Sequence, residues 1–333
     1  MQRFKNVLFH YRSAADRPPL ERAALLARRN QAHLTVVEVL EDLPSDLGMA
    51  NNGPPPADLV ISVTKERQER LQQLTASLVE NDSQTRATVL VGTPFLEITR
   101  EVLREGHDLV MMTAEGPLGL KKVLFGSTSM HLMRKCPCPV WVMKPVPRRR
   151  STRILAAVAP DPFNRERDAL NITIMDLASS LAKREQAELH VVHVWDVSLG
   201  NRLNRPSGMT KVRQNEWHRM VREHHKTALF KLFDAYKQDS PGRVHLVKGR
   251  PGNLIPKLAE KEKVDLIVMG TVCRTGVPGF FMGNTAESIL QQVECSVLTV
   301  KPDGFVTPVA EDLQEQLPKA VPDAAIEEVS SQS

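Results

Sequence analysis

The chain has 333 residues, of which 41% are hydrophobic and 25% are charged, with a formal net charge of +5. This length predicts two domains of roughly 150 residues each, and the balance of residue types excludes a disordered chain, a collagen-like repeat and a small disulfide scaffold. No apolar run approaches the ~20 residues that cross a bilayer, and no signal peptide opens the sequence. We therefore expect a cytoplasmic protein without a membrane partner.

The charge is unevenly distributed along the chain. From Asp303 to Ser333 seven acidic residues stand against one lysine, so this segment carries −6 and the rest of the chain +11. We expect residues 303–333 to be an acidic, disordered tail. The basic body could attract anions. Direct nucleic-acid binding is not expected, because the Arg148–Arg150 run lies between domains and aromatic residues, which would stack on bases, are few.

One segment of the sequence occurs twice. Residues 27–41 read ARRNQAHLTVVEVLE and residues 182–196 read AKREQAELHVVHVWD, with eight identical positions at a spacing of 155. Further along, Gly92-Thr-Pro94 matches Gly249-Arg-Pro251 at a spacing of 157. A repeat of this length indicates a duplicated domain rather than a solenoid. We predict domains at 1–146 and 153–302, joined by a linker at 147–152.

Strand and helix patterns alternate through both copies. In the first copy we predict strands at 6–11, 34–40, 85–91, 108–113 and 139–143, and helices at 18–30, 59–79, 94–105 and 127–135. In the second we predict strands at 153–159, 189–195, 244–247, 265–270 and 296–300, and helices at 164–185, 214–237, 252–261 and 284–292. Strands that are apolar throughout are typical of parallel sheets covered on both faces. The predicted fold class is α/β, with two tandem doubly wound, Rossmann-like domains of five parallel strands each.

In doubly wound folds ligands bind beyond the carboxyl ends of the strands, which points to the loop after the fourth strand of each copy. Glycines let the backbone approach a ligand, and helix starts favour anions. The candidate binding residues of the first copy are Gly116, Gly119, Gly126, Ser127 and Thr128. Those of the second copy are Gly270, Gly276, Gly279, Gly283, Asn284 and Thr285. Helix capping alone also explains Ser127 and Asn284.

The stretches DLIVMGTVCRTG, GNTAESIL and CSVLTVKP resemble the universal stress protein family in its tandem-domain type. The resemblance covers residues 3–302. It implies an adenine-nucleotide alpha-hydrolase-like fold, and a protein that supports stress survival, including resistance to DNA damage. It implies ATP or ADP as a ligand, held by a G-x2-G-x9-G-[ST] loop and by an Asp at the end of the first strand. It also implies that Val140–Met143 and Val297–Val300 pair within the chain as a pseudo-dimer. Further homodimerisation stays open.

Both copies depart from the family motif. The first has Thr113 in place of the first glycine, and the second has Cys273 at the middle glycine and Asn284 at the Ser/Thr position. Arg12 and Ala159 stand where the first-strand Asp is expected, so Arg12 joins the candidate binding residues. Two ligand classes remain: an adenine nucleotide in either copy, or an apolar, lipid-like molecule in the second copy. Apolar residues of the second loop favour the latter, namely Val277, Phe280, Phe281 and Met282.

Sequences typical of catalytic sites are not found. GxSxG, HExxH and GxxxxGK[ST] do not occur, so we expect a binding protein without catalytic residues, with a slow ATPase as the alternative. His190 and His193 should point to opposite faces of their strand, and we expect His224 and His225 to be an exposed pair. We therefore predict no metal site.

Overall fold

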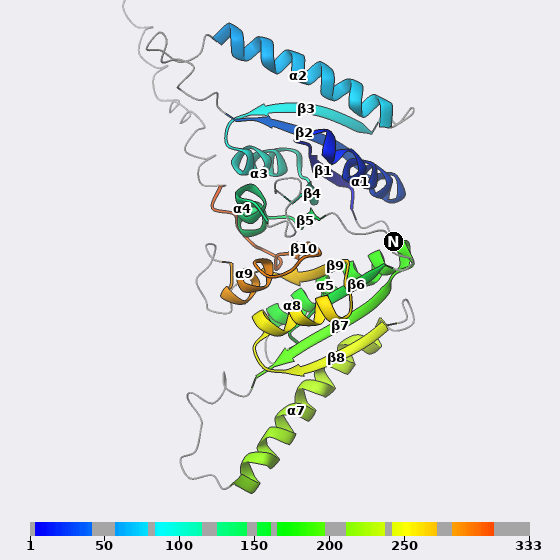
Figure 1. Ribbon diagram of the computed structural model, residues 1–333, viewed down its shortest axis with the longest axis vertical. Helices are drawn as coiled ribbons and strands as arrows, with labels where there is room; N and C mark the ends of the chain where they lie inside the picture. Colours follow the sequence, from blue (N-terminus) through cyan, green and yellow to red (C-terminus); the bar gives the residue numbers. More distant parts are fainter. Residues whose placement is uncertain are drawn as a thin grey trace, which may run out of the picture.

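A ten-stranded sheet with helices on both faces forms the body of the computed structural model (Figure 1). The strand order is β3-β2-β1-β4-β5-β10-β9-β6-β7-β8. The structure describes residues 4–41, 57–78, 84–114, 125–144, 152–160, 165–196, 211–236, 242–271 and 282–309.

The first half of the sheet, with its helices, is here called domain 1. It comprises β1 (Asn6–His10), the short 3-10 helix η1 (Ala14–Asp16), α1 (Arg17–Asn30), β2 (His33–Leu40), α2 (Ala57–Leu78), β3 (Thr85–Val91), α3 (Pro94–Glu105), β4 (Leu109–Thr113), α4 (Ser127–Lys135) and β5 (Val140–Met143). Domain 2 comprises β6 (Arg153–Ala157), α5 (Arg165–Glu185), β7 (Glu188–Trp195), α7 (Lys211–Asp234), β8 (Gly242–Lys248), α8 (Pro251–Lys261), β9 (Leu266–Gly270), α9 (Asn284–Leu290) and β10 (Ser296–Val300).

All the predicted elements are found, and their ends differ from the prediction by at most three residues. The strand β8 begins two residues earlier than predicted because Gly242 pairs with Leu189 of β7. A Cβ on Gly242 would lie 2.4 Å from the carbonyl oxygen of Leu189, so only glycine allows this pairing.

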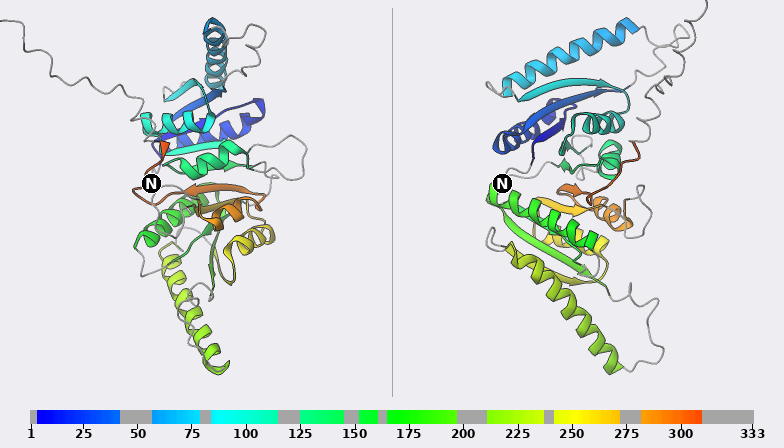
Figure 2. Two further views of the ribbon diagram at one scale, coloured as in Figure 1. Left: turned by 90° about the vertical axis from the view of Figure 1, so that its left-hand side faces the viewer. Right: turned by 180° about the vertical axis from the view of Figure 1, so that it is seen from behind.

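Two helical layers cover the sheet, one on each face (Figure 2). The helices α1, α2, α5 and α7 pack on the face that carries Phe9, while α3, α4, α8 and α9 pack on the face that carries Leu8. Neighbouring strand residues therefore enter different cores, and both are fully buried. This is the doubly wound arrangement that continuous apolar strands predict.

The duplication is also visible in the backbone. Gly92 and Gly249 precede α3 and α8 with φ of 136° and 140°, a conformation that favours glycine. Gln31 and Gln186 end α1 and α5 with the same φ of 53°. Equivalent residues thus make the same turns in the two domains.

The two domains join edge to edge through their last strands. The strands β5 and β10 run antiparallel, with Trp141 opposite Leu298, whereas the pairs within each domain are parallel. This confirms the expected pseudo-dimer. Lys144 Nζ donates to the Val293 carbonyl oxygen at 2.8 Å, and Lys301 Nζ donates to that of Met133 at 2.7 Å. Each lysine thus binds carbonyl oxygens at the end of the other domain's last helix.

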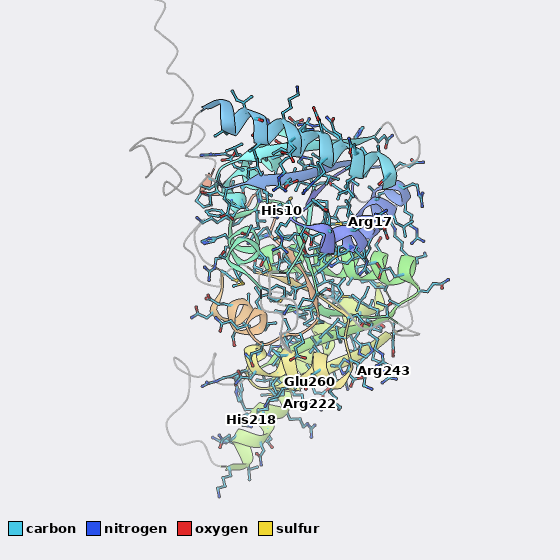
Figure 3. All side chains as sticks on the ribbon, turned by 45° about the horizontal axis from the view of Figure 1, so that its top comes forward. His10, Arg17, His218, Arg222, Arg243 and Glu260 are labelled. Carbon is cyan, nitrogen blue, oxygen red and sulfur yellow. The ribbon has the colours of Figure 1, made fainter. Side chains whose placement is uncertain are left out.

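Beyond β10, Thr307 and Val309 are buried, and residues 310–333 lie outside the described part. Of the predicted linker only Thr152 is described. The helix α7 projects past the sheet, and Figure 3 shows His218 and Arg222 on its outer part. Among the described helices, none has the length and apolar character to cross a membrane.

Candidate functional site

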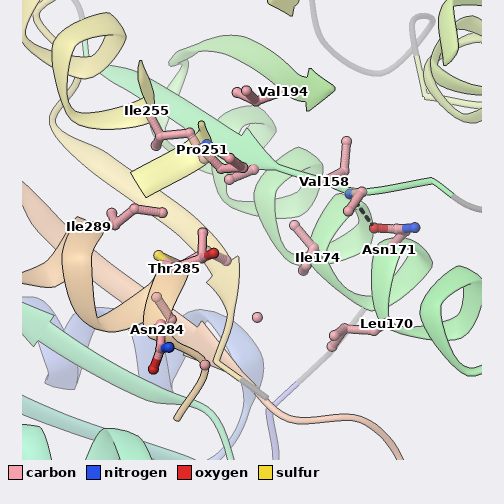
Figure 4. A pocket seen from close by; sticks show the side chains of 16 residues that line it. Val158, Leu170, Asn171, Ile174, Val194, Pro251, Ile255, Asn284, Thr285 and Ile289 are labelled. Atoms are coloured by element: carbon pink, nitrogen blue, oxygen red, sulfur yellow. Dashed lines mark hydrogen bonds between the residues drawn. The ribbon is translucent and has the colours of Figure 1, made fainter. Parts of the chain in front are cut away.

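A pocket of about 400 Å³ lies at the carboxyl ends of β6 and β9 in domain 2 (Figure 4). Its walls come from the end of β6, α5, β7 and the starts of α8 and α9. Most of the lining side chains are apolar, including Leu170, Ile174, Val194, Ile255 and Ile289. The side chains of Asn171, Asn284 and Thr285 add polar groups. Such a pocket suits a small molecule with a large apolar part and a few polar atoms.

Asn171 on α5 has an unused hydrogen-bond donor in this wall. Its Oδ1 accepts a hydrogen bond from the backbone N–H of Ala159 at 2.9 Å (Figure 4). Because an N–H can only donate, this bond fixes the oxygen toward Ala159 and leaves Nδ2 on the other side. Asn171 is 4% exposed, and Nδ2 meets no acceptor among the described residues. An unpaired buried donor costs about 1–3 kcal/mol, so an acceptor on a ligand would bind here favourably.

The predicted loop residues of domain 2 lie at this pocket where they are described. Gly270, Gly283, Asn284 and Thr285 all line it. A Cβ on Gly270 would lie 2.8 Å from Leu170 Cδ2, so any larger residue would displace Leu170 within the wall. Gly283 is the N-cap of α9 and makes no side-chain cap. The remaining residues of this prediction, Gly276 and Gly279, lie outside the described part.

In domain 1 the side chain of Arg12 fills the corresponding place. Its Nη2 donates to Thr113 Oγ1 at 2.7 Å and to the carbonyl oxygens of Thr113 and Ala114 at 3.0 and 3.3 Å. Asp16 accepts the backbone N–H of Arg12 at 2.8 Å, and the hydroxyl of Thr113 donates to its other carboxylate oxygen. The guanidinium is therefore held between the ends of β1 and β4.

Three positions distinguish the two domains. In the sheet, Asn6 pairs with His33 and Arg153 pairs with Glu188. Since His33 and Glu188 are equivalent in the repeat, Asn6 is equivalent to Arg153. Arg12 and Ala159, each six residues further along, are therefore equivalent as well. Asp16 and Asn171 are equivalent at the spacing of 155. Asp16 accepts the backbone N–H of Arg12, and Asn171 accepts that of Ala159. Thr113 and Gly270 end the fourth strands at the spacing of 157. The set Arg12, Asp16 and Thr113 occupies space that Ala159, Asn171 and Gly270 leave open.

Domain 1 has a more polar cavity of about 440 Å³ at the starts of α3 and α4, where Pro94, Ser127 and Thr128 stand at the positions of Pro251, Asn284 and Thr285 in the pocket of domain 2. Ser127, Thr128 and His131 line it, and Arg12 is not among its lining residues. That Arg12 and Ser127 contact the same ligand stays a prediction. Gly126 is the N-cap of α4. The remaining residues of this prediction, Gly116 and Gly119, lie outside the described part.

Sequence reasoning missed Asn171, although a signal was present. The repeat aligns it with Asp16, so a polar residue recurs at the same place in the first helical segment. The prediction for His225 was wrong, because this residue is half-buried and its Nδ1 lies 2.9 Å from His193 Nε2. The helix α7 packs its inner part on β7 and brings the two rings together. Within the described residues, no group of three His, Cys, Asp or Glu side chains could hold a metal ion.

These features define a class of protein: two doubly wound α/β domains fused edge to edge, with a ligand-sized pocket at the strand ends of one of them. The model of the universal stress protein family matches residues 3–144 and 153–301. The chain therefore belongs to the universal stress protein family, as a member of the tandem type.

Curated relatives agree with this assignment, and a solved structure shares the fold. The chain is 34% identical to Universal stress protein E of Escherichia coli K12 over 226 residues, which cover 67% of this chain and 69% of that protein. It is 26% identical over 300 residues to Universal stress protein E of Photorhabdus laumondii, covering 89% and 94%. A Pseudomonas aeruginosa PAO1 protein described as functionally unknown has the same fold, with a TM-score of 0.69, 23% identity and coverage of 95% and 99%.

Proposed function

We propose that this tandem universal stress protein is a non-enzymatic, cytoplasmic binding module that supports survival under stress, including exposure to DNA-damaging agents. Its ligand site is the pocket of domain 2, and ligand occupancy alters the surface that the protein offers to a partner. One observation carries the proposal: the pocket of about 400 Å³ at the ends of β6 and β9 is open where domain 1 holds Arg12.

An adenine nucleotide is the first ligand class that we propose for this pocket. The flat purine ring suits the apolar walls of Leu170, Ile174 and Ile255, and a ring nitrogen can accept a hydrogen bond from Asn171 Nδ2. The start of α9 at Asn284 and Thr285 lies at the other end of the pocket, where backbone N–H groups can meet a phosphate.

Isothermal titration of ligand-free protein with ADP and ATP tests the nucleotide proposal. We expect saturable heat with one site per chain. A parallel titration with GTP reports whether the purine edge matters, because GTP presents an oxygen and an amino group where ATP presents only an amino group. The absence of heat with both ADP and ATP would overturn the nucleotide proposal.

A second candidate is an apolar, lipid-like ligand, which the largely apolar lining of the pocket favours. Among the described lining residues, none carries a charge that would neutralise a triphosphate. Native mass spectrometry of untreated protein tests this candidate directly. An added mass that organic solvent extracts would support it, and a spectrum with only the bare chain would count against it.

A slow ATPase remains as an alternative outcome. It predicts Mg²⁺-dependent phosphate release that falls when Asn284 and Thr285, or Gly126 and Ser127, are replaced. Release that is unchanged in both variants would identify a contaminating enzyme.

A further inference from the structure

The helix α7 carries six exposed side chains in a regular pattern along one side. They lie alternately four and three residues apart, and all are exposed: Val212, Glu216, Arg219, Glu223, Lys226 and Phe230. This spacing aligns side chains along a helix in the pattern by which two helices pack together. We call these six residues the α7 stripe.

The part of α7 that carries most of the stripe gains little from packing on its own domain. Within this fully described helix, the buried side chains are Leu229 and Phe233, both near its end. The preceding part projects past the sheet (Figures 1 and 2). An isolated helix of this length is only marginally stable in water, because its first turn fixes several residues for a single hydrogen bond. A second helix along the stripe would supply the missing packing.

The charged members of the α7 stripe are complementary to each other when two copies run in opposite directions. Around a two-fold axis at the middle of the stripe, Glu216 of one copy meets Lys226 of the other. In the same way, Arg219 of one copy meets Glu223 of the other. Each pair forms twice, because a two-fold contact uses the same residues from both copies. In a parallel pair each charged residue would meet its own counterpart, so like charges would face each other.

Apolar side chains match in the same arrangement. Val212 is 67% exposed and meets Phe230 of the other copy, which is 41% exposed, at each end of the stripe. Met220 is 61% exposed and lies on the flank of the stripe beside the two-fold axis, so it meets its own counterpart. On the other flank the guanidinium of Arg222 lies 3.3 Å from the Glu223 carboxylate, which balances the charge of the two arginines that approach there. The pairing therefore covers exposed apolar groups at both ends and at the centre.

Contacts within the single chain leave the charges of the stripe available. Glu216 and Arg219 make no ion pair with any described residue. The carboxylate of Glu223 lies 3.6 Å from Lys226 Nζ, but about half of each side chain is exposed. Exposed pairs of this kind contribute little to stability. Exchanging this contact for pairs with a second copy therefore costs little.

We propose that α7 is the surface through which two copies of this chain associate, as an antiparallel helix pair with two-fold symmetry. The last strands β5 and β10 are already paired with each other within the chain, so α7 is a separate surface. The stripe spans about 27 Å, and the contact of one helix with another is small for a permanent dimer. We expect a weak association, with a dissociation constant on the order of 10–100 µM.

Analytical ultracentrifugation of the full chain between ~1 and ~500 µM tests this proposal. We expect a reversible equilibrium between monomer and dimer in the wild type. Glu216→Lys and Lys226→Glu should each weaken the association at least ~10-fold, because each change places two like-charge pairs in the contact.

Exchanging the charges distinguishes this pairing from other contacts. Glu216→Lys combined with Lys226→Glu in one chain restores opposite charges, so association should return to within ~3-fold of the wild type. An equimolar mixture of the two single variants should also associate, because a chain with two lysines then faces a chain with two glutamates. Lys65→Glu is the matched control, since it makes the same change at an exposed residue of α2 and should leave association unaltered.

Three results would overturn the proposal. A wild type that stays monomeric over the whole range would show that α7 does not pair with itself. Association that neither single change weakens would place the contact elsewhere on the molecule. Failure of both the double variant and the mixture to associate would contradict the antiparallel arrangement. Circular dichroism verifies that each variant keeps the helix content of the wild type.

Discussion

The two domains share one fold and differ at the carboxyl ends of their first and fourth strands. In domain 1 Arg12 spans this place and binds Thr113, with Asp16 beside it. In domain 2 the equivalent residues are Ala159, Gly270 and Asn171, and a pocket of about 400 Å³ remains. The difference teaches that a duplicated domain can keep its architecture while three side chains decide whether the space at the ends of its first and fourth strands is open.

The contacts within domain 1 make Arg12 a structural side chain. Its guanidinium donates to one hydroxyl and two carbonyl oxygens, which a ligand would have to replace. Burial and the Arg12 charge also lower the pKa of His10, at the end of β1, to about 3. The space at the ends of β1 and β4 in domain 1 is thus filled by charged and polar groups, whereas the space at the ends of β6 and β9 in domain 2 is lined mainly by apolar side chains.

Transferring the residues of domain 1 into domain 2 should have the largest effect. The triple variant Ala159→Arg, Asn171→Asp and Gly270→Thr places a guanidinium, its carboxylate and its hydroxyl partner in the pocket. We expect the affinity for ADP, or for any ligand that copurifies, to fall at least ~100-fold, because the new side chains occupy the ligand's space. Calorimetry measures the loss, and retained affinity would contradict the equivalence of the three positions.

The reverse exchange should open domain 1. The triple variant Arg12→Ala, Asp16→Asn and Thr113→Gly removes the guanidinium without leaving a buried carboxylate unpaired. We expect a second ligand site per chain and a loss of ~1–3 kcal/mol in the free energy of unfolding, because charged hydrogen bonds are removed. Native mass spectrometry counts the bound ligands, and denaturant unfolding measures the stability. A stoichiometry that stays at one would show that more than these residues closes domain 1.

A single conservative change should then test the donor in the domain 2 pocket. Asn171→Asp keeps the acceptor for the Ala159 N–H and replaces Nδ2 with an oxygen. We expect about tenfold weaker ADP binding, since one hydrogen bond to the ligand is lost and a negative charge is added. The matched change in domain 1, Asp16→Asn, should leave ADP binding unaltered. Equal binding by the wild type and Asn171→Asp would exclude a role for Nδ2.

The smallest effect at neutral pH concerns His10, which stands where domain 2 has Ala157. Its folded-state pKa of about 3 lies below the value of 6.5 in the unfolded chain, so the folded state binds fewer protons between these values. Stability is therefore unaffected above pH 6.5 and falls as the pH drops from 6.5 toward 3. In His10→Leu this part of the slope should disappear, as urea unfolding at several pH values would measure. An unchanged slope would mean that other groups cause the acid sensitivity.

Much of the fold was predictable because its signals are local. The repeated motifs around Ala27 and Ala182 defined two copies, and the alternation of apolar strands and helices placed each element. The pairing of β5 with β10 followed from the family resemblance. The copies and their elements needed only neighbouring residues or a comparison of the two copies, whereas the pairing of the last strands needed the resemblance.

The state of each site was not predictable in the same way, because it depends on contacts between distant segments. Arg12 and Thr113 are 101 positions apart, and nothing near Arg12 in the sequence indicates that its guanidinium binds that strand end. Likewise, His225 bonds to His193 only because α7 packs on β7. The alignment of Asn171 with Asp16 was available, but its meaning required the hydrogen bonds to Ala159 and Arg12.

A crystal structure of the wild-type protein soaked with ADP tests the difference between the domains most directly. We predict electron density for the ligand between Ala159, Asn171 and Gly270, with Arg12 still bound to Thr113. Density for ADP at the ends of β1 and β4, with Arg12 displaced and domain 2 empty, would contradict it.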